Sequence, residues 1–208
     1  MANKRKKKLN VKTRTADLII DEAERLIGDH GMDGLRLDDI SDVLGIQRPS
    51  LYTHFKGREG IITAIAERAF IELSHQFQDD NSADPEKTIR NGVYELVKFL
   101  REHKAYALLL ARDFSTPGGL PAVNAVLGPT QSVVVPAILK PLYERLDLIL
   151  GRGCQSGKFR QVDSFTFLTI LLGSIIACLL QHRQKLDELE ILIAELALGL
   201  LLIAKDTA

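Results

Sequence analysis

A short polar and basic segment, residues 47–58, carries the side chains with the clearest chemistry in this sequence. It holds three cations and no acid, together with amide, hydroxyl and imidazole groups. Arginine can bind guanine through two parallel hydrogen bonds, glutamine can read adenine, and hydroxyls and cations can hold phosphates. We therefore predict a DNA-binding segment with these candidate residues: Gln47, Arg48, Pro49, Ser50, Tyr52, Thr53, His54, Lys56 and Arg58.

Two short helices joined by a glycine turn are predicted to position this segment. Asp38 and Asp39 favour the start of the first helix, because negative charge suits the positive end of a helix dipole. Gly45 can end that helix in the left-handed conformation, and Pro49 suits the first turn of the next one. A short helix, a tight turn and a second crossing helix form a helix-turn-helix. Its second helix is the candidate DNA reader.

The same stretch has a recognisable pattern. The glycine turn is followed by Pro-Ser-Leu-Tyr at residues 49–52, by His54-Phe55 and by the basic residue Arg58. Over residues 37–59 the sequence resembles the N-terminal signature of the TetR family of transcriptional regulators. The resemblance implies an N-terminal DNA-binding domain followed by a larger helical domain.

The resemblance also implies roles for single residues. Arg48, Pro49 and Ser50 would enter the DNA groove, Tyr52 and His54 would approach the backbone, and Arg58 would replace a lysine that usually grips phosphate. Leu37 departs from the family, which commonly has a threonine there. Leu37 cannot cap the helix or touch phosphate, so we expect Asp38 and Asp39 to offset the lost cap in part.

The whole chain is predicted to be all-α, with about nine helices. We expect a basic disordered arm at residues 1–14, a three-helix helix-turn-helix domain at 15–57, a connecting helix at 58–79, and a helical ligand-binding and dimerisation domain at 85–208. Thr15 can cap the first helix, and later breaks fall near His103, at residues 115–121 and 151–157, and near residues 182–185.

The basic arm adds positive charge to one end of a chain whose formal net charge is zero. Seven lysines and arginines occupy its fourteen residues without any acid. Both a phosphate-binding arm and a solvated tail fit this pattern.

Two late helices carry more apolar surface than one domain can cover. Spacings of three and four residues, and a strip of small residues at every fourth position, are typical of closely packed helices. We predict a homodimer built on these helices, with the candidate interface residues Phe165, Leu168, Thr169, Leu172, Gly173, Ile175, Ala177, Leu192, Leu196 and Gly199.

A small-molecule effector is implied by the family resemblance. A mostly aromatic set with two polar groups suits an amphipathic or acidic molecule, although simple core packing explains each residue as well. The candidates are Phe99, His103, Tyr106, Arg112 and Tyr143.

Other functional classes find little support. The sequence has no GxSxG, HExxH or Walker A motif, no metal spacing among its five histidines and no disulfide framework from its two cysteines. We predict no enzyme, cofactor or metal site. Residues 167–180 and 189–204 fall short of the roughly 20 residues that cross a membrane, which argues against a membrane protein. The N-terminus is charged where a secretory signal would be apolar, so we expect a cytoplasmic protein.

The predicted function is that of a sequence-specific transcriptional regulator, a repressor released from a palindromic operator by a ligand. The alternatives are a non-regulatory DNA-binding protein and a helical small-molecule-binding protein. A non-regulatory DNA-binding protein would leave the large second helical domain unexplained.

Overall fold

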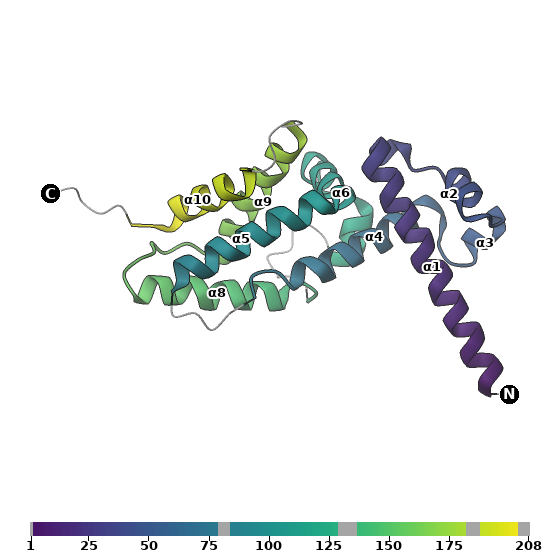
Figure 1. The fold of residues 1–208 in the computed structure, drawn as a ribbon, viewed down its shortest axis with the longest axis horizontal. Helices are drawn as coiled ribbons and strands as arrows, with labels where there is room; N and C mark the ends of the chain where they lie inside the picture. The colour runs from purple at the N-terminus through teal and green to yellow at the C-terminus, as the bar shows by residue number, and fades with distance from the viewer. Residues whose placement is uncertain (1, 79–83, 129–136, 182–187, 204–208) are drawn as a thin grey trace. The chain divides into compact units, whose positions relative to one another are not determined.

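A computed structural model describes residues 2–78, 84–128, 137–181 and 188–203, with side chains described from residue 14 onward. Within these ranges the chain forms ten α-helices, one 3-10 turn and one isolated β-bridge, between Phe159 and Leu202 (Figure 1). The prediction of an all-α fold is therefore confirmed. The helices group into two compact units.

The first unit comprises residues 1–69 and 103–130. Its elements are α1 (Ala2–His30), η1 (Met32–Gly34), α2 (Leu37–Leu44), α3 (Arg48–Tyr52), most of α4 (Gly57–Ser74), α6 (Lys104–Ser115) and α7 (Pro121–Leu127). The core is built from side chains that recur every three or four residues and therefore share one helix face. Ile19, Ile27, Ile40, Leu51 and Ile65 are almost completely buried.

The second unit comprises residues 70–102 and 131–208. It holds the end of α4 together with α5 (Pro85–Glu102), α8 (Lys140–Gln155), α9 (Ser164–Gln181) and α10 (Leu189–Leu201). Helix α5 packs against α10 and α8, and α9 packs against the same two helices, as the ribbon of Figure 1 shows for α5 and α10. Val93, Leu96, Leu146, Phe167 and Ile193 lie in its core.

Helix α1 begins earlier than the sequence suggested. Its backbone is helical from Ala2, so Thr15 lies inside the helix and does not cap it. The physical reason is that residues 2–15 contain no Gly or Pro and are rich in lysine and arginine, which are good helix formers. The expected disordered arm is helical in the structure, and its side chains before Arg14 lie outside the described residues.

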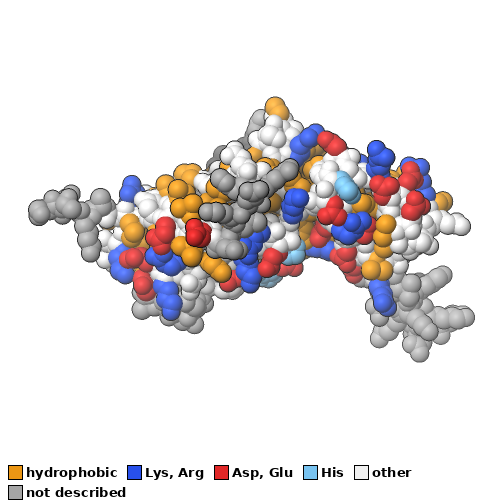
Figure 2. Space-filling view, turned by 45° about the horizontal axis from the view of Figure 1, so that its top comes forward, with side chains coloured by type: hydrophobic (Ala, Val, Ile, Leu, Met, Phe, Trp, Pro, Cys, Tyr) orange, Lys and Arg blue, Asp and Glu red, His pale blue; other side chains and the backbone are white. Residues whose placement is uncertain are grey.

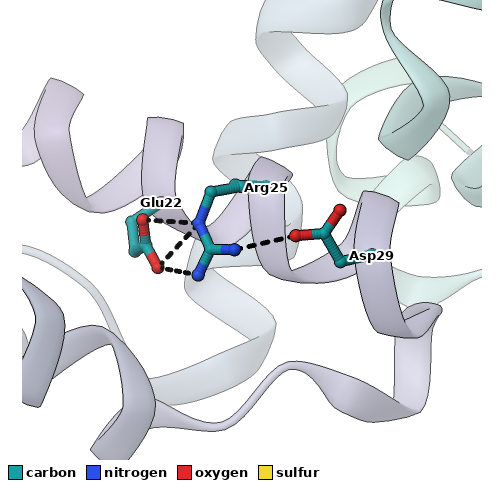
Figure 3. A network of polar contacts seen from close by, with 3 residues as sticks. All are labelled: Glu22, Arg25 and Asp29. Carbon is teal, nitrogen blue, oxygen red and sulfur yellow. Dashed lines mark hydrogen bonds and ion pairs between the residues drawn. The ribbon is translucent and has the colours of Figure 1, made fainter.

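Ion pairs along α1 support its exposed face. Arg25 lies between two acids, with Nη2 2.6 Å from Oε1 of Glu22 and Nη1 2.7 Å from Oδ2 of Asp29 (Figure 3). These partners are three and four residues away, the spacing at which side chains meet on a helix surface. Hydrogen bonding to Glu22 is the largest cause of a raised Arg25 pKa.

The region between α6 and α9 also differs from expectation. We predicted one long helix there, whereas the structure has two, α7 and α8. Helix α7 ends at Gly128, whose φ of 81° suits glycine, and the sequence continues with a proline. This break explains why the described ranges contain ten α-helices, whereas about nine were predicted. The predicted break at residues 182–185 lies outside the described residues.

The two units divide the chain differently from the predicted domains. Residues 103–130, with α6 and α7, belong to the same unit as α1, α2 and α3. The reason is packing, because α6 contacts both α1 and η1. The domain boundaries drawn from the sequence stay predictions. In the structure, α6 packs in the same unit as the helix-turn-helix.

Helix α9 is longer than the apolar stretch considered in the sequence. Its 18 residues have a mean hydropathy of 2.0, enough by length and composition to cross a membrane, and 39% of them are buried. Packed helices of globular proteins meet the same criteria. Since α9 contacts α8 and α10, we treat it as a packed helix, and the absence of a membrane partner stays a prediction.

Candidate DNA-binding site

The first helix of the candidate site, α2, starts without a side-chain cap. Arg36 occupies the N-cap position in extended conformation, and Leu37 is the first helical residue. Our expectation that Leu37 stands at the cap was wrong by one residue. Asp38 and Asp39 do lie in the first turn, as predicted, and Ser41 donates a hydrogen bond from Oγ to the carbonyl of Leu37 at 3.0 Å.

The turn after α2 has the expected glycine geometry. Gly45 adopts φ 62° and ψ 31°, the left-handed conformation that an L side chain rarely takes. Its N–H donates to the carbonyl of Asp42, and the N–H of Ile46 donates to the carbonyl of Ser41 at 3.0 Å. These bonds satisfy the end of α2 and redirect the chain into α3.

The candidate reader, α3, is short and anchored by one buried side chain. It runs from Arg48 to Tyr52, with Gln47 as an extended N-cap and Pro49 in the first turn. Leu51 is 1% exposed and fixes α3 to the core of the first unit. The anchor leaves the polar side chains of α3 on the outside.

Most of the predicted DNA-binding residues are exposed. Gln47, Arg48, Pro49, Tyr52, Thr53 and Lys56 are exposed, while Ser50, His54 and Arg58 are partly buried. Tyr52 is 55% exposed, so its ring is not packed into the core. Because α3 ends at Tyr52, the following residues Thr53, His54 and Lys56 lie in a turn, where Thr53 Oγ1 donates to the carbonyl of Ser50 at 2.7 Å.

Arg58 has a structural role that the sequence did not reveal. Its guanidinium donates to the carbonyls of Met32 and Leu35, the latter at 3.3 Å from Nε. These bonds attach the start of α4 to η1. The guanidinium is thus occupied within the protein, and phosphate binding by Arg58 stays a prediction.

Two charged residues near α3 were missed by the sequence reasoning. Asp38 Oδ1 lies 3.2 Å from Arg48 Nη1, which joins the first turn of α2 to the first residue of α3. Arg36 is an exposed cation at the N-cap of α2. In the sequence, Asp38 and Arg36 were recognisable only as charged residues close to the glycine turn. The contact between Asp38 and Arg48 depends on how α2 and α3 cross, which the sequence does not show.

The predicted effector-binding residues are distributed over the two units. His103, Tyr106 and Arg112 belong to the first unit, and Phe99 and Tyr143 belong to the second. The His103 and Tyr106 rings stack with centroids 5.0 Å apart, and Tyr143 stacks on Phe165 at 6.3 Å. Burial raises the pKa of Tyr143.

A small cavity of about 210 Å³ lies in the first unit. Of the predicted effector-binding residues, only Arg112 lines it. The remaining lining residues come from η1, α4 and the start of α7, and are Met32, Asp33, Arg58, Glu59, Ile62, Leu120, Pro121 and Ala122.

A polar cluster joins α1, α4 and α6 in the first unit. Tyr106, only 2% exposed, donates from its hydroxyl to Oε1 of Glu24 at 3.0 Å. Arg68 Nη1 lies 3.2 Å from the same oxygen and 2.5 Å from Oδ1 of Asp21. Burial raises the pKa of Glu24 despite these partners, whereas for Arg68 the nearby carboxylates outweigh burial and raise the pKa.

The predicted dimer interface is partly exposed. Phe165, Thr169, Ala177, Leu192, Leu196 and Gly199 lie on the surface, Gly173 is partly exposed, and Leu168, Leu172 and Ile175 are buried within the unit. Among the described residues, no atom outside the local helix backbone lies within 4 Å of a Cβ placed on Gly173 or Gly199, so another helix could approach both. Figure 2 shows hydrophobic side chains reaching the surface beside acidic and basic ones.

In the described part of the chain, no group of three or more His, Cys, Asp or Glu side chains is placed to hold a metal ion. Cys154 and Cys178 are free thiols.

Comparison with known proteins adds to this geometry. Residues 19–65, which run from the second half of α1 to the middle of α4, match the family model described as bacterial regulatory proteins, tetR family. Similar chains include the class C tetracycline repressor protein of Escherichia coli, 32% identical over 76 residues, or 36% of this chain and 34% of the repressor.

A second relative covers more of the sequence. The chain is 34% identical over 109 residues to IcaR of Staphylococcus epidermidis, described as the HTH-type negative transcriptional regulator of the icaADBC biofilm operon. That match takes in 50% of this chain and 56% of IcaR. The chain thus spans about a third and just over half of the length of these curated relatives.

The fold is similar to that of a solved regulator over nearly the full length. The crystal structure of FadR from Bacillus subtilis in complex with stearoyl-CoA superposes with a TM-score of 0.64, covering 88% of this chain and 97% of FadR. At 19% identity, this likeness concerns the fold alone.

Proposed function

We propose that the chain is a sequence-specific DNA-binding transcriptional regulator, because residues 19–65 match the family model described as bacterial regulatory proteins, tetR family. The observation that carries the proposal is the exposed surface of α3. Gln47, Arg48 and Pro49 are exposed at its start, while Leu51 holds the helix to the core. A rigid helix with an exposed polar end suits readout of base edges in the major groove.

We propose that the chain acts as a homodimer. The exposed apolar side chains Phe165, Leu192 and Leu196 are costly in water, and open space over Gly173 and Gly199 favours close helix approach. A two-fold partner covers the same patch on both subunits. The dimer would present two copies of α3 to half-sites about 34–36 Å apart in a palindrome.

We propose repression relieved by a small molecule. The curated relatives are repressors or negative regulators by name, and the FadR crystal structure contains stearoyl-CoA. A ligand can release the operator only if it binds the non-binding geometry more tightly, because equal affinity shifts no population. A cytoplasmic location follows from this function.

The test is selection of bound duplexes from a random-sequence pool, followed by fluorescence-anisotropy titration. We expect the wild-type chain to select a palindrome. Arg48→Ala should lose most of the preference for it, because a bidentate arginine contributes about 1–3 kcal/mol of discrimination against the wrong base. Lys104→Ala removes an exposed cation from α6 and serves as the matched control.

Sedimentation of the complex then counts the subunits on the selected duplex. Two copies per palindrome support the proposed assembly. Failure of the wild-type chain to enrich any sequence would contradict the proposed function, and equal behaviour of Arg48→Ala and Lys104→Ala would show that α3 is not the reader.

The selected duplex also tests induction. We expect a bound effector to lower the affinity of the chain for this duplex, and stearoyl-CoA is the first molecule to titrate. An equal loss of affinity for the palindrome and for random DNA would contradict a switch in dimer geometry, since that switch weakens specific binding first.

A further inference from the structure

An acidic side chain lies beside the candidate base-reading arginine. Asp38 Oδ1 and Arg48 Nη1 are 3.2 Å apart, and the two side chains are 65% and 56% exposed. Ion pairs with this exposure add little to folding stability, because water screens them and both side chains lose rotamer freedom. The contact therefore has little value for the fold itself.

For a DNA-binding surface the same carboxylate is unfavourable. DNA presents a dense row of phosphates, and binding to any sequence depends on neutralising them with cations. Asp38 repels phosphate and offsets one of the cations that would attract it. An acid at this position weakens binding to all sequences, unless it improves binding to the correct one.

The geometry supplies that improvement. A free arginine samples many rotamers and loses that freedom when it contacts a base. The guanidinium has five N–H donors, so a carboxylate that accepts from one edge leaves other donors for O6 and N7 of a guanine. Preorganising Arg48 in this way lowers the cost of the specific contact.

We propose that Asp38 is a specificity-determining residue, which positions Arg48 for a guanine in the major groove and disfavours binding to phosphate alone. The inference rests on the proposed function. Asp38 and Arg48 belong to different helices, so the contact joins the side chain of the reader helix α3 to the first turn of α2.

The neighbouring carboxylates provide an internal comparison. Asp42 is exposed on the same helix, but no ion pair joins it to Arg48 in the described part of the chain. Asp38→Asn and Asp42→Asn therefore remove the same charge from α2, and only the first removes the contact with Arg48.

The experiment measures the ratio of affinities for the selected duplex and for random-sequence DNA at one salt concentration. For Asp38→Asn we expect tighter binding to random DNA and a fall in the ratio of about fivefold, the lower end of what a bidentate base contact contributes. For Asp42→Asn we expect tighter binding to both duplexes with an unchanged ratio. Asp38→Glu should keep part of the wild-type ratio.

A double-mutant cycle separates positioning from charge. In the Arg48→Ala background, Asp38→Asn should leave the ratio unchanged, because the residue that it positions is absent. An unchanged ratio for Asp38→Asn in the wild-type background would overturn the inference, as would an equal fall for Asp42→Asn. If the wild-type chain selects no sequence, the proposed function fails instead. Equal melting temperatures of the variants show that the fold is intact.

Discussion

The hydroxyl of Tyr106 on α6 and the guanidinium of Arg68 on α4 meet at the same oxygen of Glu24 on α1. The distances to Oε1 are 3.0 Å and 3.2 Å. One partly buried carboxylate thus joins three helices of the first unit. Because α6 is separated from α1 by more than 70 residues of chain, this contact is a long-range attachment, and its strength can be tested.

Tyr106→Phe should destabilise the protein by about 1 kcal/mol. The change keeps the ring and deletes one hydrogen bond to a carboxylate, and a typical hydrogen bond contributes about 0.5–1.5 kcal/mol net. Urea unfolding followed by circular dichroism measures the effect. Tyr94→Phe, at a tyrosine that is 43% exposed, is the matched control and should change little. Equal effects of the two substitutions would mean that the hydrogen bond between Tyr106 and Glu24 makes no measurable contribution to the free energy of unfolding.

Glu24 should give the protein a distinct pH dependence. Burial raises its pKa in the folded state above the ordinary value of about 4.3. Between these two pKa values the folded state binds more protons than the unfolded state, so this group adds stability as pH falls and loses it as pH rises. Thus the stability of wild type relative to Glu24→Gln should increase on acidification from neutral pH towards pH 4.3. An opposite slope in paired urea titrations would contradict the raised pKa.

Two glycines on α8 should respond oppositely to the same change. A Cβ on Gly153 would overlap the ring of Phe159, which is 2% exposed, whereas a Cβ on Gly151 has no neighbour beyond its own helix backbone within 4 Å among the described residues. Gly153→Ala should cost about 1–3 kcal/mol through overpacking. Gly151→Ala should stabilise by about 0.5–1 kcal/mol, because alanine loses less backbone entropy in a helix. Thermal unfolding of both variants decides this, and a common sign would refute the local packing described here.

A buried ion pair between α5 and α10 should matter more than an exposed one. Arg101 lies 2.5 Å from Glu190, whose side chain is 3% exposed, and Arg90 pairs with the exposed Glu195. Arg101→Ala leaves a buried acid without its cation and should cost about 3–5 kcal/mol. Arg90→Ala should cost about 0–1 kcal/mol. The comparison is made by urea unfolding, and a restored stability in Arg101→Ala/Glu190→Gln would trace the loss to the uncompensated charge.

The sequence was sufficient for features that depend on near neighbours. The left-handed Gly45, the place of Pro49 in the first turn of α3 and the exposure of Gln47 and Arg48 follow from turn chemistry and local polarity, and all were predicted. The helical state of the chain follows from apolar residues that recur every three or four positions. For these features the predictions from local sequence agree with the observed structure.

Features that depend on distant contacts were missed. Arg58 was predicted to hold phosphate, but the fold brings it to the carbonyls of Met32 and Leu35. Tyr106 was assigned to an effector pocket, whereas its hydroxyl binds Glu24, 82 positions away in the chain. Asp38 was read as a helix-start residue only. In each case the partner lies on another helix, and no local pattern encodes that meeting.

Because α3 is short, one copy of it can contact only a few base pairs of an operator. Five residues rise about 7.5 Å along a helix axis, which corresponds to about two base-pair steps of DNA. So few base pairs carry little information, and a genome offers about 10⁶–10⁹ competing sites. A single copy of α3 would therefore bind many sites in a genome. Recognition of one operator requires a second copy of α3 that contacts a second half-site at a fixed distance.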